Sequence, residues 1–278
     1  MADCKNCPSK GQCKSQDSCA IKNNPFNNIG TVIGVMSGKG GVGKSTVTAL
    51  LAKQLKSMGY SVGVMDADIT GPSIPRLLGV KDARVEESEM GLIPARTKDG
   101  INVMSLNLLI QDEMQPVIWR GPIISGTVKQ FWEDVFWGEL DYLLIDMPPG
   151  TGDVALTVMQ SIPITGMVIV SVPQDMVSMI VAKAVNMVKA LKVPLLGMVQ
   201  NMSCVVCPDC GKTIRIFGAD TSAVCEALDL PLLGELPMKA ELAALTADGV
   251  AAADNEIRDT VCGIAEKIVN AVTVKEGL

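Results

Sequence analysis

Short apolar segments alternate with amphipathic segments along most of the chain. The apolar segments are rich in Val, Ile, Leu and Met without two-residue alternation, which is typical of strands buried on both faces of a parallel sheet. They predict strands over Thr31–Ser37, Ser61–Met65, Ile101–Leu106, Tyr142–Ile145, Gly166–Val172 and Leu195–Gln200. The amphipathic segments predict helices. These cover Ser45–Met58, Val128–Phe136, Val154–Ser161, Ser178–Leu191, Ala219–Leu228 and Ile257–Val272.

This regular alternation of strand and helix predicts right-handed βαβ units in a doubly wound α/β fold with a mostly parallel sheet. Residues 1–28 lack the pattern and are rich in Lys, Asn, Ser and Cys, so we expect a Cys-rich N-terminal extension there. Residues 29–278 are expected to form the folded domain. The charged segment Val85–Asp99 is predicted to be an exposed hairpin.

Charge and composition exclude several classes of protein. The chain has 24 basic and 30 acidic residues, a net charge of −6, which argues against general binding to nucleic acid or to anionic membranes. It has no uninterrupted apolar run of about 20 residues, and its polar start resembles neither a signal nor a transit peptide. We therefore expect a cytoplasmic protein. The absence of histidine excludes Ser–His–Asp triads and HExxH metalloproteases.

A phosphate-binding motif follows the first predicted strand and precedes the first predicted helix. Its residues are Gly38, Lys39, Gly40, Gly41, Val42, Gly43, Lys44 and Ser45, which match G-x-x-x-x-G-K-[ST]. Glycines let backbone N–H groups surround phosphate oxygens, and the helix start favours negative charge. Lys44 is expected to reach the β- and γ-phosphates, and the hydroxyl of Ser45 to bind Mg²⁺.

Carboxylates end two other predicted strands. Asp146 ends an apolar strand in the Walker B arrangement and is expected to bind Mg²⁺ directly or through water. Asp66 and Asp68 follow another strand. The carboxyl ends of parallel strands are where ligands bind in this architecture, although helix capping or turn formation is the alternative role for such residues.

The nine cysteines are unevenly distributed. Four lie near the start: Cys4, Cys7, Cys13 and Cys19. A second group consists of Cys204, Cys207 and Cys210, and Cys225 and Cys262 lie on predicted helices. Cys-x-x-Cys spacing in a cytosolic protein favours metal or redox chemistry over disulfides.

The phosphate loop, with Lys39 in it, resembles the deviant Walker A motif of dimeric ATPases such as the nitrogenase iron protein and the Min and Par ATPases. Within that class the chain is similar to the Mrp/nucleotide-binding-protein family of iron–sulfur cluster carriers. The segments that match are Asp66–Ser73, Trp119–Pro122, Asp146–Asp153, Val199–Ser203 and Cys207–Cys210. The resemblance implies a nitrogenase iron protein-like P-loop NTPase domain over 29–278, with a Cys-x-x-Cys insertion at 204–216.

The resemblance also implies roles for individual residues. Lys39 would reach the ATP of the partner subunit, and Asp68 would position the attacking water. Asn201 and the segment around Pro237 would hold the adenine, and Gly150–Asp153 would sense the γ-phosphate. Thr46 completes the nucleotide-binding loop.

Cys207 and Cys210 would ligate a 4Fe–4S cluster. One pair supplies two thiolates where four are needed, so a two-fold homodimer would complete the set. A structural zinc with the same four ligands is the alternative, and a thioredoxin-like redox pair is a weaker one. Cys204 is a third nearby thiol or a packing residue.

The N-terminal cysteines resemble the extension of eukaryotic-type scaffold members, which carry a second 4Fe–4S cluster. Cys4, Cys7 and Cys13 match the end of that pattern, but Cys19 replaces a cysteine far upstream. The four are expected to hold a cluster or zinc, or to belong to a disordered tail.

We therefore expect a homodimeric ATPase with slow, Mg²⁺-dependent hydrolysis that carries a 4Fe–4S cluster to apo iron–sulfur proteins. One alternative is a reductase resembling the nitrogenase iron protein, which the close pairing of the cysteines opposes. The other is a zinc-clasped targeting or positioning ATPase. Such a protein would need a membrane helix or a basic DNA-binding face, and the short, mixed tail Val272–Leu278 offers neither.

Overall fold

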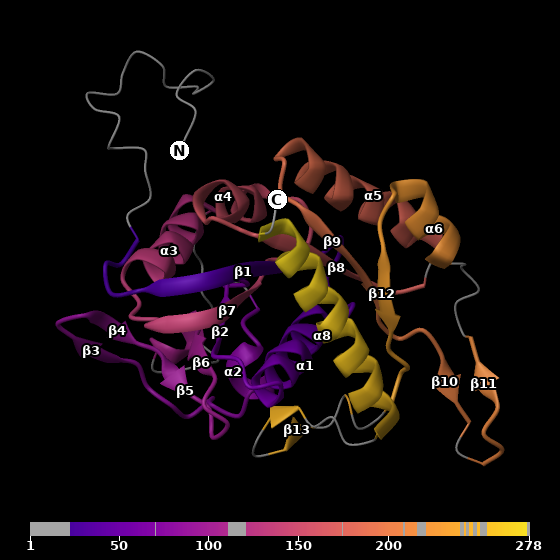
Figure 1. The fold of residues 1–278 in the computed structure, drawn as a ribbon, viewed down its shortest axis with the longest axis horizontal. Helices are drawn as coiled ribbons and strands as arrows, with labels where there is room; N and C mark the ends of the chain where they lie inside the picture. The colour runs from indigo at the N-terminus through magenta and orange to yellow at the C-terminus, as the bar shows by residue number, and fades with distance from the viewer. Residues whose placement is uncertain are drawn as a thin grey trace.

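A central sheet organises the protein, for which the computed structural model describes residues 23–69, 71–110, 121–173, 175–207, 209–215, 221–239, 242, 245–246, 249–250 and 255–276. The sheet strands are β1 (Asn28–Ser37), β2 (Val62–Asp66), β5 (Ala95–Arg96), β6 (Asn102–Met104), β7 (Glu139–Asp146), β8 (Gly166–Ser171), β9 (Leu195–Gln200) and β12 (Leu232–Glu235). Within these described residues their order is β12-β9-β8-β1-β7-β2-β6-β5 (Figure 1). Only the edge pair β5–β6 is antiparallel among them. The predicted mostly parallel sheet is confirmed.

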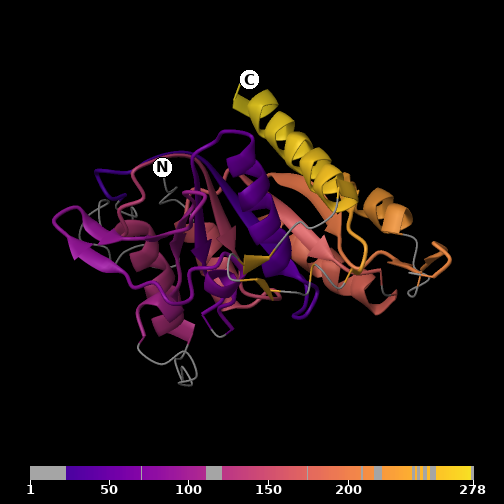
Figure 2. The same cartoon turned by 90° about the horizontal axis from the view of Figure 1, so that it is seen from below.

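Helices cover both faces of the sheet. They are α1 (Lys44–Ser57), α2 (Ile74–Leu77), α3 (Gly121–Glu133), α4 (Asp153–Ser161), α5 (Asp175–Ala190), α6 (Thr221–Leu228) and α8 (Asn255–Glu276). Helix α1 packs with α8 on one face, and α3 with α4 and α5 with α6 on the other (Figures 1 and 2). Right-handed crossovers explain this, because the chain steps from β1 towards β2 in one direction and from β7 through β8 and β9 to β12 in the opposite one.

The predicted strands and helices all overlap observed ones. The prediction for α3 was wrong at both ends, since the helix begins at Gly121 rather than Val128 and ends at Glu133 rather than Phe136. Proline is favoured in a first helical turn, and Pro122 stands there. After Glu133 the backbone pairs with a neighbouring strand instead: the N–H of Leu92 donates to the carbonyl of Asp134, and the N–H of Phe136 to that of Leu92.

Burial explains why the central strands lack alternation. Every residue of β2 and β8 is buried. In β1, the side chains of Ile33, Val35 and Met36 have no exposed area. Two-sided burial of such strands removes apolar area from water, and each Å² removed stabilises the fold by about 25 cal/mol.

Short hairpins extend from this core. The hairpin of β3 (Glu86–Ser88) and β4 (Gly91–Ile93) confirms the predicted exposed hairpin. The hairpin of β10 (Val205–Val206) and β11 (Thr213–Ile214) projects beyond β12 at the opposite end of the molecule (Figures 1 and 2). A third joins β13 (Leu245–Thr246) and β14 (Gly249–Val250). No helix in the described part of the chain combines the length and the apolarity needed to cross a membrane.

Candidate nucleotide and cluster site

The phosphate loop joins β1 to α1 at the carboxyl edge of the sheet. Strand β1 pairs with β7 on one side and with β8 on the other, so the loop lies where the strand order reverses. Ligands of open α/β sheets bind at this position. Gly43 precedes α1 in a left-handed conformation with φ of 80°, and Gly41 also has a positive φ of 78°. These conformations explain the two glycines and leave the N–H groups of the first helical turn directed at the loop.

The side chain of Asn201 is hydrogen-bonded to the phosphate loop. This residue follows β9, its N–H donates to the carbonyl of Ser171, and its Nδ2 donates to the carbonyl of Val42 over 2.9 Å. A Cβ atom on Gly43 would lie 2.2 Å from that Nδ2. The amide therefore occupies the space that any side chain at position 43 would need.

Gly43→Ala should destabilise the nucleotide-free protein by at least about 1–2 kcal/mol, the usual cost of a left-handed conformation in a residue with a Cβ. The new methyl group would also displace Asn201 from Val42. Thermal unfolding measures the loss. Gly40→Ala is the matched control in the same loop, since a Cβ there would meet nothing within 4 Å. Equal melting temperatures for the two variants would contradict this account of Gly43.

Lys44 and Asp146 form a buried ion pair at the base of the loop. Lys44 Nζ lies 2.6 Å from Asp146 Oδ2, with 6% and 0% of the two side chains exposed. Ser45 Oγ donates to the same oxygen over 2.6 Å, and Thr48 Oγ1 to Asp146 Oδ1 over 2.8 Å. The predicted residues Lys44, Ser45 and Asp146 are thus brought together. Thr48 was missed, although its place one helical turn after Lys44 was the available signal.

Asp66 is the second buried carboxyl at this edge. It lies opposite Asp146 in the β2–β7 register and is 1% exposed. Its Oδ1 accepts the N–H of Asp68, and its Oδ2 accepts the hydroxyl of Ser105 over 3.2 Å. Burial, reinforced by the negative charge of Asp146, raises the pKa of Asp66 from 3.8 to about 8. Burial thus favours the neutral form of Asp66 in the nucleotide-free fold.

Asp68 and Lys39 lie closer to solvent. Asp68 Oδ2 is 3.9 Å from Lys44 Nζ, and the side chain of Asp68 is 14% exposed. Lys39 is half-buried, and its carbonyl accepts the hydroxyl of Ser37. Both therefore stand at the mouth of the loop, where a side chain can still reach a ligand.

The raised pKa of Asp66 makes stability depend on pH. A folded-state pKa above the unfolded value stabilises the fold fully below pH 3.8, and this contribution is lost as the pH rises through about 8. Between pH 6 and 9 the melting temperature of the wild type should therefore fall further than that of Asp66→Asn, by about 2–4 °C for each kcal/mol involved. Thermal scans without nucleotide test this. Parallel pH profiles for the two proteins would show that Asp66 is already ionised at pH 6.

The donors at this edge fit a magnesium nucleotide. Mg²⁺ prefers a few carboxylate and hydroxyl oxygens together with phosphate oxygens, and Ser45 and Asp146 supply the protein part of that set. The N–H groups of the loop and the positive charge of Lys44 suit phosphate. When bound, the ion would supply charge neutralisation at the phosphates.

Gly150 connects the predicted γ-phosphate segment to the end of β1, next to the phosphate loop, by a hydrogen bond. Its N–H donates to the carbonyl of Ser37 over 2.8 Å, and Asp153 begins α4. Pro237 is buried beside Leu236, whose N–H donates to the carbonyl of Gln200. Among the described residues, the buried Oε1 of Gln200 has no hydrogen-bond donor. This acceptor lies beside Asn201, one of the residues that the family resemblance predicts to hold the adenine.

Cys207 and Cys210 occupy the turn of the β10–β11 hairpin. The N–H of Cys207 donates to the carbonyl of Lys212, and the N–H of Gly211 donates back to the carbonyl of Cys207. Backbone N–H groups of Cys210 and Asp209 point at the sulfur of Cys207 and lower its pKa. Cys210 is exposed and Cys207 half-buried, so the turn presents two accessible sulfurs, and the N–H groups favour the thiolate form of Cys207.

Comparison with known proteins shows the family of this chain. A family model described as "ParA: NUBPL iron-transfer P-loop NTPase" matches residues 28–273. The chain belongs to this family. An iron-sulfur cluster carrier protein of Clostridium perfringens is 49% identical over 90% of this chain and 94% of the relative. One of Methanocaldococcus jannaschii is 44% identical over 95% of this chain and 96% of its own.

Solved structures of this P-loop NTPase class share the fold. A nucleotide-binding protein from Archaeoglobus fulgidus, solved in complex with ADP, is 41% identical, with a TM-score of 0.69 over 85% of this chain and 88% of that chain. The cell division ATPase MinD of Pyrococcus furiosus superposes with a TM-score of 0.62 at 21% identity, over 87% of this chain and 99% of its own, and shows the fold alone. The predicted nitrogenase iron protein-like P-loop fold is confirmed at the level of this class.

The structure brings Lys44, Ser45 and Asp146 together and places Cys207 and Cys210 in one turn. In the described residues, no group of three or more Cys, Asp or Glu side chains could hold a metal ion, so Cys204 does not join Cys207 and Cys210 in one site. Instead, the carbonyl of Cys204 accepts the N–H of Met238. The remaining predicted ligands lie outside the described residues: Cys4, Cys7, Cys13 and Cys19.

Proposed function

We propose that this protein is an ATP-dependent carrier that binds a 4Fe–4S cluster at a homodimer interface and passes it to apoproteins. The observation that carries the proposal is the exposed two-thiol turn of the β10–β11 hairpin, whose Cys207 lies six residues after Asn201, a contact of the phosphate loop. The names of the relatives, iron-sulfur cluster carrier protein, support the same conclusion.

The cargo needs ligands from two subunits. Cys207 and Cys210 supply two thiolates, and a 4Fe–4S cluster takes four. A two-fold axis at the hairpin turn doubles the pair. Transfer then needs no net redox change, because the thiolates of a client replace those of Cys207 and Cys210 on the iron atoms. An exposed turn suits this exchange, since a client can approach the cluster from solvent.

ATP hydrolysis would use the buried ion pair and the residues at the mouth of the loop. Lys44 holds the β- and γ-phosphates, while Ser45 and Asp146 hold Mg²⁺. Asp68 positions the water that attacks the γ-phosphorus, and the bond to the bridging oxygen breaks to release ADP and phosphate. Lys39 of each subunit neutralises charge on the nucleotide of its partner, as an arginine finger does. Asn201 and Pro237 hold the adenine, and Thr46 adds a hydroxyl to the loop.

One short segment connects the two ligands. Asn201 contacts Val42 of the phosphate loop, and Cys207 follows six residues later. Between them Met202 adopts a left-handed conformation with φ of 55°, which is uncommon for a residue other than glycine. A nucleotide that displaces Asn201 from Val42 would therefore move the segment that leads to the cluster ligands. This is how ATP would change the exposure or affinity of the cargo.

The N-terminal cysteines would form a second sulfur site, with a cluster or zinc as its occupant. We place the protein in the cytoplasm, without membrane or nucleic-acid partners. Its client proteins share one property, the need for a 4Fe–4S cluster.

A transfer assay tests the proposal. Reconstituted protein is mixed anaerobically with apo-aconitase, and the recovery of aconitase activity is followed with and without Mg-ATP. We expect transfer within minutes and a several-fold change in its rate with ATP. Stable redox cycling of a cluster that is never donated would support the reductase alternative. Zinc at the turn without iron uptake would support a targeting or positioning ATPase.

A further inference from the structure

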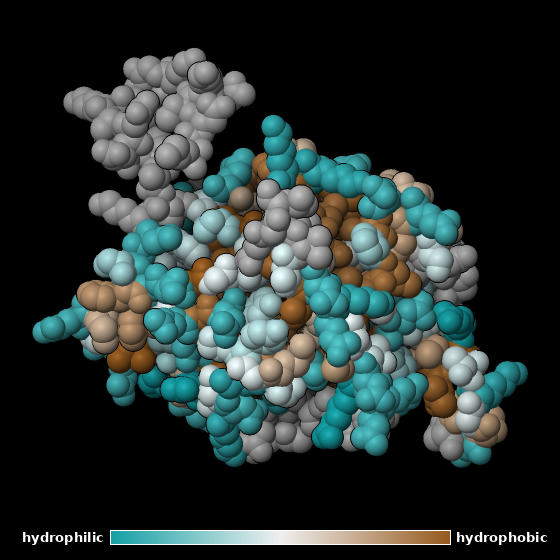
Figure 3. Space-filling view, viewed as in Figure 1, coloured by the Kyte–Doolittle hydropathy of each residue, from teal (hydrophilic) through white to brown (hydrophobic). Residues whose placement is uncertain are grey.

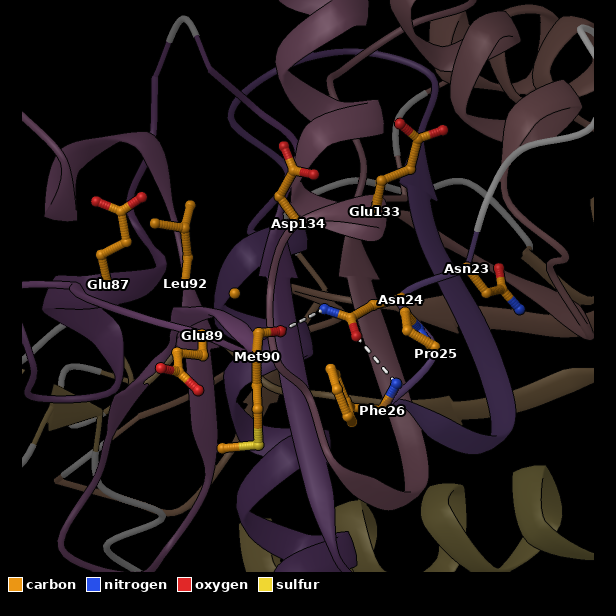
Figure 4. A pocket seen from close by; sticks show the side chains of 11 residues that line it. Asn23, Asn24, Pro25, Phe26, Glu87, Glu89, Met90, Leu92, Glu133 and Asp134 are labelled. Carbon is orange, nitrogen blue, oxygen red and sulfur yellow. Dashed lines mark hydrogen bonds between the residues drawn. The ribbon is translucent and has the colours of Figure 1, made fainter.

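A pocket of about 640 Å³ opens at the amino edge of the sheet, away from the phosphate loop (Figure 4). Its walls come from Asn23–Phe26 before β1, the β3–β4 hairpin, and Glu133 and Asp134 at the end of α3. Strand β1 separates this edge from the phosphate loop by ten residues, about 33 Å. The pocket is therefore remote from the proposed nucleotide site.

Acidic side chains flank the pocket on two sides. Glu87 and Glu89 come from the β3–β4 hairpin, and Glu133 and Asp134 from the end of α3 (Figure 4). In the part of the chain that the structure describes, none of these four carboxylates pairs with a lysine or arginine. Four carboxylates around one opening favour a cationic occupant.

Apolar side chains lie next to this charge. Phe26 is 54% exposed and Met90 39% exposed, and Ile93 of β4 is 38% exposed. Figure 3 shows the resulting apolar patch at the left edge, where β3 and β4 lie in Figure 1. The pocket thus suits a segment that combines lysines with an apolar residue.

The start of the described chain is fastened to the pocket wall. Asn23 Oδ1 accepts the indole N–H of Trp132 over 2.6 Å. Asn24 is buried, and its Nδ2 donates to the carbonyl of Met90 over 2.8 Å (Figure 4). Residues 1–22 are therefore joined to the domain at the pocket itself.

Residues 1–22 have a net positive charge, which is opposite to that of the pocket. They carry four lysines (Lys5, Lys10, Lys14 and Lys22) against two aspartates, whereas the rest of the chain has 20 basic and 28 acidic residues. Ile21 supplies an apolar side chain next to Lys22. We propose that this pocket is the docking site of the chain's own Cys-rich N-terminal segment, held by lysines against Glu87, Glu89, Glu133 and Asp134.

Docking would keep two groups of cysteines apart. Cys19 is four residues from Asn23, within about 14 Å along an extended chain. Cys207 and Cys210 follow β9 at the carboxyl edge of the sheet. A metal or cluster on the docked segment would therefore not share ligands with the hairpin turn of the same subunit. The docking itself does not depend on the cargo or on ATP.

Zero-length carbodiimide cross-linking of the full-length reduced protein tests the proposal, because it joins only carboxylates and amines in contact. Links from Lys5, Lys10 and Lys14 to Glu133 and Asp134 are quantified by mass spectrometry. Lys22 is left out because it is adjacent in sequence to the pocket. Glu87→Lys/Glu89→Lys should reduce these links at least about fivefold, and raising the salt from 50 to 500 mM should reduce them in the wild type.

The control is Glu226→Lys/Glu266→Lys, which makes the same charge change at exposed positions of α6 and α8. It should leave the links unchanged. A mixture of isotopically heavy and light protein distinguishes links within one chain from links between chains. The proposal is overturned if the links join different chains, if both double variants behave alike, or if Lys5, Lys10 and Lys14 couple no more to Glu133 and Asp134 than to Glu226 and Glu266. None of these outcomes bears on cluster transfer.

Discussion

Replacing Cys207 and Cys210 together by serine should lower iron uptake on anaerobic reconstitution by about four irons per dimer, the content of one 4Fe–4S cluster. The reason is the ligand count. Each subunit contributes two sulfurs at the hairpin turn, and serine hydroxyls do not replace thiolates as ligands of a labile cluster. Iron held by the N-terminal cysteines should remain in the variant.

The fold should tolerate this change. Cys210 is exposed and Cys207 half-buried, and the backbone hydrogen bonds of Cys207 with Lys212 and Gly211 involve neither sulfur. A serine oxygen at position 207 can accept the N–H groups of Asp209 and Cys210 that point at the sulfur. The melting temperature of the metal-free variant should therefore match that of the wild type. Cys225→Ser/Cys262→Ser is the matched control for iron content, since these residues lie on α6 and α8, away from the turn. If Cys207→Ser/Cys210→Ser took up as much iron as the wild type, the hairpin cysteines would not be cluster ligands.

Lys44→Ala should reduce ATP hydrolysis at least about 100-fold, the scale of losing one preorganised charge at a reacting phosphate. The ammonium of Lys44 is the cation that contacts Asp146 at 2.6 Å and faces the phosphate site. Cluster transfer should lose its response to ATP in the same variant. The rate of phosphate release measures hydrolysis, and Lys56→Ala in the last turn of the same helix is the matched control.

Loss of Lys44 also removes positive charge from the vicinity of two buried carboxyls, so a stability effect must be separated from a catalytic one. Lys39→Ala makes that separation, because Lys39 lies at the mouth of the loop rather than under it. It should bind ATP and melt like the wild type, yet hydrolyse slowly. ATP-responsive transfer by Lys44→Ala would show that the nucleotide site does not drive the cargo.

Much of the fold could be predicted because its cause is local. The central strands are apolar without alternation because both of their faces are buried. The phosphate loop can be identified from its glycines, two of which adopt a positive φ. Strand β12 and the end of α3 were harder to predict from the sequence. Strand β12 is four residues long, and residues 134–136 leave the helix to pair with β4, a contact that no local pattern encodes.

Some residues of the candidate site could likewise be predicted from the sequence, and others could not. Lys44, Ser45 and Asp146 could be predicted from motif spacing, whereas Thr48 and Ser105 reach the buried carboxyls only through the packing of α1 and the turn after β6. Cys204 has the same spacing to Cys207 as Cys207 has to Cys210, yet it precedes β10, where its carbonyl accepts the N–H of Met238. Spacing alone does not distinguish the sulfur of Cys204 from that of Cys210.

Native mass spectrometry of the reconstituted protein shows whether one cluster joins two subunits through the hairpin cysteines. The Cys4→Ser/Cys7→Ser/Cys13→Ser/Cys19→Ser variant is used so that only the hairpin cysteines can hold metal. We expect a dimer that carries one 4Fe–4S cluster, and monomers without iron once a chelator has removed the cluster. One zinc ion per dimer without iron, or a full cluster on a monomer, would contradict this expectation.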